Sequence, residues 1–501
     1  MTCAEKVAEL KPNVLLIVLD CVRADRMSCY GYGKDTTPNL RSLAKESTTF
    51  DAAISAAPWT LPSHASMFTG LYPSEHGAVT WDSALRKDVR TLSQILSGVG
   101  YHTAAVCHND AWINARTVLA EGFQSFHGSY AIDTSSIMGR YADSRMKNLP
   151  ALGTLAAFYN SFILRKEKAA LSIALIKSIL RESRSTNIPV FIFVNLINAH
   201  YPYVHGLPNQ SLKAFLEETR ENWLRTITRY KSRGTVARVD PRTVMNRKWK
   251  QLATRAEFTP SEFRGFGALY DTVISYLDRQ LGDLLSFMRT ENILDQTLLM
   301  ITADHGENLG DHGLIDHELS VHESLIRVPL VARYPGVFPA KRRIAQPVET
   351  RRIFHTILDI SGARSSEDTR TKSLVNTLER QESGSYAFGE YYPSQGLLSR
   401  LAMYSSAISP EDRNFRRFVR DVDFKLVKYG NGQEELYSLR EGEIQVNRDQ
   451  YSEVYHRLKG EIEAWEKRLE ISKVSDASEA PTFSDKEQKM LEERLRALGY
   501  Y

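Results

Sequence analysis

Short apolar runs recur along the first two thirds of the chain, and segments with helical spacing separate them. The runs lie at residues 14–19, 103–107, 190–196, 297–302 and 328–332. Continuous apolar runs of this length are typical of strands that are buried on both faces of a sheet. Between them, apolar residues recur at helical spacing, most clearly over 269–288. The pattern predicts an α/β fold with a mixed, mainly parallel sheet between two layers of helices.

The pattern changes near residue 385, where the runs become shorter. Three short strands are predicted around the dipeptide Asn431-Gly432, which favours a hairpin turn, at 417–420, 424–429 and 435–437. A helical segment follows at 451–469. We therefore expect a large domain over 1–375, a small α+β subdomain with an antiparallel sheet and a helix over 376–472, and a linker with a terminal helix over 473–501.

Two helical insertions are expected within the large domain, at about 140–185 and about 205–260. The second is strongly basic, because residues 211–256 hold twelve Lys or Arg against four acids, a local balance of +8. A solvated helical cap explains this run most simply. The alternative is a lid that attracts an anionic substrate.

Composition narrows the class of protein only slightly. The 501 residues are 42% hydrophobic and 25% charged, with a net charge of +4, which gives no indication of a nucleic-acid partner. The first apolar run, Val14 to Leu19, is too short for a membrane span or a signal peptide. The four cysteines form no CxxC pair, so reduced thiols are expected. These features predict a cytoplasmic protein without a transmembrane segment, and they leave its oligomeric state open.

Three polar clusters follow apolar runs, where the carboxyl ends of strands form the ligand-binding edge of an α/β sheet. Asp20 follows the first run directly. Thr60 lies in Trp59-Thr60-Leu61-Pro62-Ser63-His64, and Asp304-His305-Gly306-Glu307 follows the fourth run. Carboxylates and an imidazole in such positions are suited to binding a divalent metal. Thr60 is also well suited to cap a helix, and that role is compatible with a role in the site.

The order of these motifs resembles the sulfatase branch of the alkaline phosphatase superfamily over nearly the whole chain. The resemblance rests on Asn13 to Asp20, Tyr30-Gly31-Tyr32, Thr37 to Leu40, Ser66 to Gly77, Asp304 to Glu307 and Leu436 to Leu439. It implies an alkaline-phosphatase-like α/β/α sandwich with a small C-terminal antiparallel sheet. It also implies that residues 1–375 form a catalytic domain.

The chain departs from the sulfatases at the nucleophile. Sulfatases make a formylglycine from Cys or Ser in a Cys/Ser-x-Pro-x-Arg motif, whereas this chain has Thr60-Leu61-Pro62-Ser63-His64. Threonine cannot give that aldehyde. The chain is similar here to relatives that use an unmodified Thr, the phosphoglycerol transferases, and its metal positions resemble those of the phosphonate monoester hydrolases as well. We therefore expect Thr60 to be the nucleophile.

The resemblance also implies the metal site and the residues around it. Asp20, Thr60, Asp304 and His305 are the expected ligands of one divalent ion, and mixed oxygen and nitrogen ligation favours Mn²⁺, with Zn²⁺ and Ca²⁺ as alternatives. The expected catalytic residues besides Thr60 are His200, His317 and His64. The weaker candidates for substrate binding are Arg23, His108 and Asn109. Of His76, His312 and His322, at least two are expected to be structural.

The predicted function is the cleavage of phosphate mono- or diesters, by hydrolysis or transfer, through Thr60. The substrate is expected to be a small anionic ester, with lipid and sugar phosphates or sulfates included. Two alternatives stay open: a sulfuric ester hydrolase that works without formylglycine, and a non-catalytic member that binds a metal or an anion.

Overall fold

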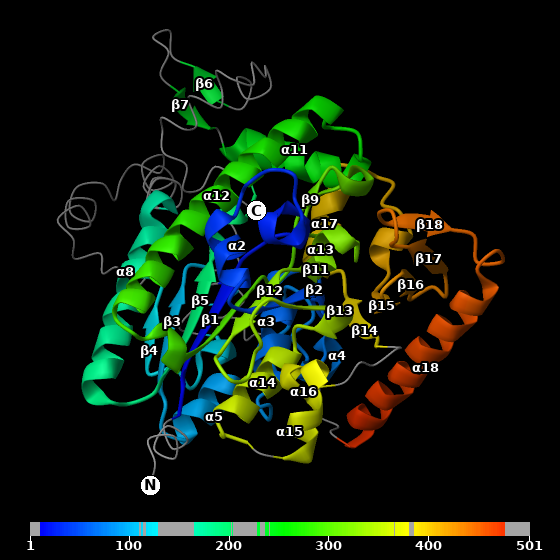
Figure 1. The fold of residues 1–501 in the computed structure, drawn as a ribbon. Helices are drawn as coiled ribbons and strands as arrows, with labels where there is room; N and C mark the ends of the chain where they lie inside the picture. The colour runs from blue at the N-terminus through cyan, green and yellow to red at the C-terminus, as the bar shows by residue number, and fades with distance from the viewer. Residues whose placement is uncertain are drawn as a thin grey trace.

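The computed structural model describes residues 11–109, 112–113, 117–128, 165–201, 203, 228–230, 236–239, 241–364, 366–379 and 385–475. Figure 1 shows a large α/β body with a smaller sheet at its side, next to the last described helix, α18 (Ser452–Ser475). No helix among these residues combines the length and apolarity needed to cross a membrane.

A nine-stranded mixed sheet forms the centre of the large body, in the order β11-β2-β12-β8-β1-β5-β3-β4, with β13 paired to β2. Its central strand, β1, is parallel to both neighbours, β5 and β8. The strands are β1 (Asn13–Leu19), β2 (Thr48–Ile54), β3 (His102–Cys107), β4 (Ser125–His127), β5 (Val190–Leu196), β8 (Thr297–Thr302), β11 (Arg327–Val328), β12 (Leu330–Arg333) and β13 (Arg342–Glu349). Strands β1, β5 and β8 are buried almost throughout, which explains their continuous apolar sequences.

Helices cover both faces of this sheet (Figure 1). One layer contains the long helices α8 (Arg165–Thr186) and α12 (Pro260–Thr290), with α2 (Pro38–Ala44) packed on α12. The other layer contains α3 (Thr60–Thr69), α5 (Leu92–Gly98) and α14 (Arg352–Ile360), which contact one another. Further helices are α4 (Pro73–His76), α11 (Pro241–Thr254), α13 (Glu323–Ile326), α15 (Glu367–Lys372), α16 (Leu374–Glu379) and α17 (Gln395–Ala402).

A five-stranded antiparallel sheet follows in the sequence, in the order β14-β15-β16-β17-β18. Its strands are β14 (Ala387–Tyr391), β15 (Arg416–Arg420), β16 (Phe424–Tyr429), β17 (Glu434–Ser438) and β18 (Ile444–Val446). Helix α18 packs on β15 and β16 through a separate apolar cluster that includes Trp465, Phe388 and Leu426. Gly432 has a φ of 86° between β16 and β17, as the predicted hairpin turn requires.

The predicted fold class is confirmed, and several elements differ in detail. The run at 328–332 is split by Pro329 into β11 and β12, and both pair antiparallel with their neighbours. The sequence pattern did not indicate β2, β4 or β13. The predicted insertion at about 140–185 lies partly outside the described residues. Within the basic insertion, the described part contains α11 and a short antiparallel pair, β6 (Thr228–Tyr230) and β7 (Val236–Val239).

Candidate active site

Four parallel strands deliver polar residues to one edge of the large sheet. The registers of β1 with β5 and β8 place Leu19 opposite Leu196 and Val18 opposite Thr302. Asp20 therefore follows β1 at the same edge where Asp304 and His305 follow β8. The same edge carries His200 beyond β5, and His108 and Asn109 beyond β3.

Asp20, Asp304 and His305 form a compact, fully buried cluster whose ligand atoms lie within 4.8 Å of one another. Asp304 Oδ1 accepts hydrogen bonds from the backbone N–H groups of Cys21 (3.2 Å) and His305 (2.9 Å). Its second oxygen, Oδ2, is buried and accepts no hydrogen bond from the residues that the structure describes. A buried carboxylate oxygen without a donor is a favourable position for a cation, because burial otherwise disfavours the charge.

Thr60 joins this cluster through its hydroxyl. Helix α3 begins at Thr60 itself, and Trp59 occupies the N-cap position without a side-chain cap. The Thr60 hydroxyl therefore does not cap the helix, and its Oγ1 lies 3.2 Å from His305 Nε2. The Nδ1 of His305 lies 2.8 Å from the carbonyl oxygen of Gly306, to which it donates in the tautomer that leaves Nε2 as an acceptor. All four expected ligands are thus brought together.

Two amides hold Asp20 in place. Asn109 and Asn195 each donate a hydrogen bond of 2.9 Å to Asp20 Oδ2. Asn109, expected at the substrate, thus contacts the carboxylate instead. Burial raises the pKa of Asp20, but the electrostatic interactions with the imidazoles of His305 and His200 and these two hydrogen bonds outweigh it, so the pKa falls to about 2.

His64 lies behind Thr60 and is fully buried. Its Nδ1 is 2.9 Å from the carbonyl oxygen of Thr60, one helical turn earlier, and its Nε2 is 3.3 Å from the amide nitrogen of Asn195. Burial lowers the pKa of His64 to about 4, so the ring is neutral at pH 7. With Nδ1 donating and Nε2 accepting, His64 links the first turn of α3 to Asn195.

His317 and His200 stand beside the cluster as an imidazole pair. The ring centroid of His317 lies 5.0 Å from that of His200 and 4.5 Å from that of His305. His317 Nδ1 lies 2.7 Å from Asp316 Oδ1 and 3.2 Å from Glu307 Oε2. Burial lowers the pKa of His317, but these two carboxylates outweigh it and hold the pKa well above its usual value. Burial lowers the pKa of His200 to about 4, so the pair combines one charged and one neutral ring.

The remaining two candidates point to other partners. His108 Nε2 lies 3.0 Å from Ser172 Oγ on α8. Arg23 is buried and donates to Asp25 (2.7 Å), Asp311 (2.6 Å) and the carbonyl oxygen of Glu307 (3.0 Å). Through these contacts Arg23 stabilises the loop that follows β8.

Electrostatics favours a cation within the cluster. Burial, together with the charge of Asp20, raises the pKa of Asp304 well above its usual value. Two carboxylates this close in a buried site repel each other unless a cation or a proton lies between them. Burial and the charge of His317 hold the pKa of His305 well below its usual value, so its imidazole is a neutral ligand. The donor set of two carboxylates, one hydroxyl and one imidazole fits a single divalent ion.

A glycine follows His305 because two backbone segments approach each other closely at Gly306. Its backbone N–H donates to the carbonyl oxygen of Leu325 at 2.7 Å, and a Cβ at this position would overlap the carbonyl oxygen of Ser324. The close approach of the two segments therefore leaves no room for a side chain and sets the direction in which His305 leaves β8.

Comparison with known proteins identifies the family. A model of the sulfatase family matches residues 12–363. The chain belongs to the sulfatase family. A second model, described as the C-terminal part of N-sulphoglucosamine sulphohydrolase, matches residues 310–468 of this sulfatase-family chain.

Individual relatives cover most of the sulfatase-family chain at low identity. An N-acetylglucosamine-6-O-sulfatase of Bacteroides thetaiotaomicron is 22% identical over 503 residues, covering 89% of this chain and 84% of its own. Human arylsulfatase D is 26% identical over 443 residues, covering 79% and 73%. A phosphonate monoester hydrolase of Agrobacterium radiobacter superposes with a TM-score of 0.66 at 21% identity, covering 92% and 96%. The family assignment makes this chain a metal-dependent, sulfatase-like ester hydrolase.

Three residues that the sequence pattern did not single out contact the expected site residues of this sulfatase-family chain, namely Asn195, Glu307 and Asp316. A fourth, Lys248, pairs with Asp316. Asn195 left a usable signal, because it is the single polar residue in the apolar run of β5. Asp316 and Glu307 lie beside residues that were selected, but nothing local indicates that both face His317. Lys248 belongs to a basic segment that reads as solvated, and it is fully buried.

The other motif histidines of the sulfatase-family chain have local partners. His76 is buried, with Nε2 3.1 Å from Ser66 Oγ. The rings of His312 and His322 stack with centroids 3.6 Å apart, and both face Glu443, which lies between β17 and β18. These contacts support the expected structural roles.

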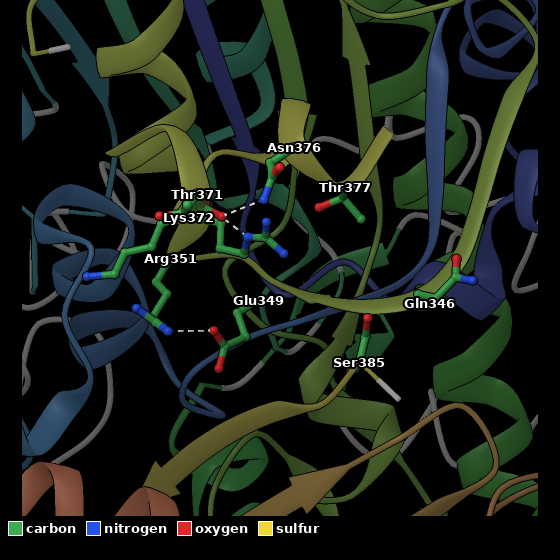
Figure 2. A pocket seen from close by; sticks show the side chains of 9 residues that line it. Gln346, Glu349, Arg351, Thr371, Lys372, Asn376, Thr377 and Ser385 are labelled. Carbon is green, nitrogen blue, oxygen red and sulfur yellow. Dashed lines mark hydrogen bonds and ion pairs between the residues drawn. The ribbon is translucent and has the colours of Figure 1, made fainter. Parts of the chain in front are cut away.

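A polar pocket of about 240 Å³ lies apart from the cluster of Asp20, Asp304 and His305, between β13 and helices α14 to α16 (Figure 2). Arg351 points to Glu349 (2.7 Å) and donates to the carbonyl oxygen of Gly70 (2.9 Å). Arg352 donates to the carbonyl oxygens of Lys372 (2.9 Å) and Ser373 (2.8 Å). Because these guanidinium groups stabilise the packing of the helices, we assign the chemistry to the buried cluster.

Glu318 should make the stability of the protein depend on pH. Its carboxyl is buried and accepts hydrogen bonds from Trp81 Nε1 (3.2 Å) and the Tyr391 hydroxyl (3.1 Å). Burial raises the pKa of Glu318 from 4.5 to about 7, so the folded chain retains a proton that the unfolded chain releases. This contribution is complete below pH 4.5 and is lost as the pH rises through 7. The Gln variant should lack that loss, which amounts to about 2–3 kcal/mol.

Denaturant unfolding at pH 5 and pH 8 measures this effect. From pH 5 to pH 8, the free energy of unfolding of the wild type should fall relative to that of Glu318→Gln. Glu46→Gln, at a carboxyl that is 42% exposed, is the matched control and should run parallel to the wild type. Parallel behaviour of Glu318→Gln would show that Glu318 does not titrate in this range.

Proposed function

We propose that this sulfatase-family chain cleaves phosphoric esters, by hydrolysis or by transfer to an acceptor alcohol, with Thr60 as an unmodified nucleophile. The observation that carries the proposal is the position of the Thr60 hydroxyl, 3.2 Å from His305 Nε2 and beside two buried carboxylates. Threonine cannot become formylglycine, so its own oxygen has to attack. Phosphorus accepts such an attack with a covalent intermediate that water or an alcohol then resolves.

Asp20, Asp304, His305 and Thr60 would hold one divalent ion, which would lower the cost of forming the Thr60 alkoxide and would neutralise charge on the ester oxygens. Mn²⁺ is favoured by the mixed donor set, with Zn²⁺ and Ca²⁺ as alternatives. Thr60 lies in the first turn of α3, where the backbone N–H groups and the helix dipole favour an anionic ester. His64 and Asn195 keep this turn against Asp20.

His317 is the proposed general acid. It is charged and lies next to the cluster, so it can protonate the departing oxygen as Thr60 Oγ1 attacks phosphorus. The neutral ring that remains can then accept a proton from the water that cleaves the Thr60 phosphoester. His200, which is neutral, is proposed to contact the ester oxygens.

A rate panel tests the proposal. The Mn²⁺-loaded protein would be assayed with 4-nitrophenyl phosphate, bis(4-nitrophenyl) phosphate, a 4-nitrophenyl phosphonate and 4-nitrophenyl sulfate. Turnover of a phosphorus ester is expected, and the preferred ester would indicate the natural class. Turnover of the sulfate alone would replace the proposal with a sulfuric ester hydrolase. A protein that turns over none of the four would be assigned to metal or anion binding.

The proposal extends to the class of substrate and to the cellular compartment. We propose a small anionic ester, such as a lipid or sugar phosphate, because the cluster and the charged His317 suit an anionic group. The three described cysteines, Cys21, Cys29 and Cys107, are free and buried, which is compatible with a reducing compartment such as the cytoplasm.

A further inference from the structure

Lys248 is a fully buried lysine in the basic segment that the sequence suggests to be solvated. It lies on α11, and its relative exposure is 0%. Two positions further on the same helix, the side chain of Lys250 is 57% exposed and pairs with Glu257. The ammonium group of Lys248 lies 4.6 Å from the ring centroid of Trp249 and 5.8 Å from that of Tyr201. An ammonium group in an apolar environment needs a charged partner.

That partner is Asp316, and a chain of contacts leads from it to the proposed acid. The Lys248 ammonium forms an ion pair with Asp316 Oδ2. The other oxygen of Asp316 lies 2.7 Å from His317 Nδ1, and Glu307 Oε2 lies 3.2 Å from the same nitrogen. Tyr203 in turn donates to Glu307 Oε1 at 2.8 Å. His317 Nδ1 is thereby committed to two carboxylates, and Nε2 is the nitrogen that can serve a substrate.

The two carboxylates beside His317 need a cation close to them on electrostatic grounds. Asp316 and Glu307 are both fully buried and approach one imidazole nitrogen. Two carboxylates so placed repel each other, and a buried, unpaired carboxylate moves towards water or takes up a proton. Asp316 also has a φ of 70°, a left-handed conformation that non-glycine residues adopt only when their surroundings hold them. The ion pair with Lys248 supplies both the countercharge and the hold.

We propose that Lys248 is a positioning residue that, through Asp316, orients the imidazole of His317 so that Nε2 faces the leaving oxygen of the ester. The inserted helix α11 thereby becomes part of the catalytic apparatus. This inference rests on the proposed role of His317 as general acid. A purely structural ion pair would instead affect folding stability and leave the chemistry of the folded protein unchanged.

The dependence of the rate on the leaving group separates these two roles. 4-Nitrophenolate departs without a proton, whereas phenolate needs one, so loss of the acid slows phenyl phosphate selectively. In Lys248→Met, kcat for phenyl phosphate should fall about a hundredfold, while kcat for 4-nitrophenyl phosphate should fall less than about threefold. Lys250→Met, on the same helix, should change neither. Equal effects of Lys248→Met on both esters would overturn the proposal.

A second variant covers a failure of Lys248→Met to fold. The double variant Lys248→Met/Asp316→Asn removes both charges and leaves no unpaired buried ion. It should show the same selective loss on phenyl phosphate. A double variant that treats the two esters as the wild type does would overturn the proposal. If the wild type cleaves sulfates only, the corresponding phenyl sulfates give the same comparison.

A measurement without turnover distinguishes this proposal from the proposed function. On the Zn²⁺-loaded protein, the Nδ1 proton of His317 between two carboxylates should give a low-field proton resonance, identified by its loss in His317→Gln. The resonance should disappear or move upfield in Lys248→Met and stay in Lys250→Met. Its persistence in Lys248→Met would refute the positioning role, whatever ester the wild type cleaves.

Discussion

Thr60→Ala should lower turnover of the preferred ester by at least about 10⁴-fold, and the protein should still fold. The substitution removes the oxygen that would attack phosphorus in the proposed mechanism. The hydroxyl of Ser63 cannot take its place, because it is bonded to the carbonyl oxygen of Asp304 at 2.6 Å. Because the Thr60 hydroxyl does not cap α3, its loss should change the helix little. Steady-state kinetics beside circular dichroism and thermal unfolding measures both parts.

Two further variants serve as controls for Thr60→Ala. Thr60→Ser keeps a hydroxyl in place and should retain measurable turnover. Thr69→Ala removes a hydroxyl of the same helix that is bonded to the carbonyl oxygen of Ala65 at 2.7 Å, and it should leave kcat unchanged. Normal turnover by Thr60→Ala would exclude the threonine mechanism.

Asp304→Asn should abolish tight metal binding and reduce turnover by at least about 10³-fold. The amide keeps an oxygen for the backbone N–H groups of Cys21 and His305, so the local hydrogen bonds can persist. It removes the anionic oxygen that accepts no hydrogen bond from the described residues, and with it one proposed ligand of the ion. Metal analysis after dialysis should find about one ion per wild-type chain and far less in the variant.

The stability of the metal-free protein distinguishes loss of the metal site from a folding defect, because a folding defect would make the variant less stable than the wild type. The metal-free variant should be at least as stable as the metal-free wild type, because the repulsion between Asp304 and Asp20 is gone. Added Mn²⁺ at 100 times its dissociation constant should stabilise the wild type by about 2.7 kcal/mol and leave the variant unchanged. Asp283→Asn, at a side chain that is 62% exposed, should behave as the wild type. An equal gain from Mn²⁺ in Asp304→Asn would place the ion elsewhere.

The two imidazoles beside the cluster differ in charge, which fits the different roles proposed for them. His317 receives a countercharge from Asp316 and Glu307, whereas burial leaves His200 neutral. A charged donor at the leaving oxygen and a neutral ring beside it suit a substrate whose own charge is carried by the ester group. In the proposed mechanism the buried acids therefore have two different functions, since one set would hold the metal and the other would orient the proposed general acid.

Local patterns in the sequence were sufficient for the framework of this protein. Continuous apolar runs identified β1, β3, β5 and β8 because a strand buried on both faces has no polar alternation. Asp20, Asp304 and His305 were found because polar residues directly after such a strand lie at the ligand-binding edge. Thr60 was found from the order of motifs, in which its neighbours match the sulfatases and it does not.

Only the tertiary structure decided which polar groups meet. Asn195 on β5 and Asn109 just beyond β3 reach Asp20, and Lys248 reaches Asp316 from an inserted helix. Arg23, selected for a substrate, is instead held by Asp25 and Asp311. Apart from Arg23 and Asp25, these partners are far apart in the sequence, by as much as 288 positions for Arg23 and Asp311, so no local spacing records them. Burial then sets the charge of each group, and burial is a property of the packed fold.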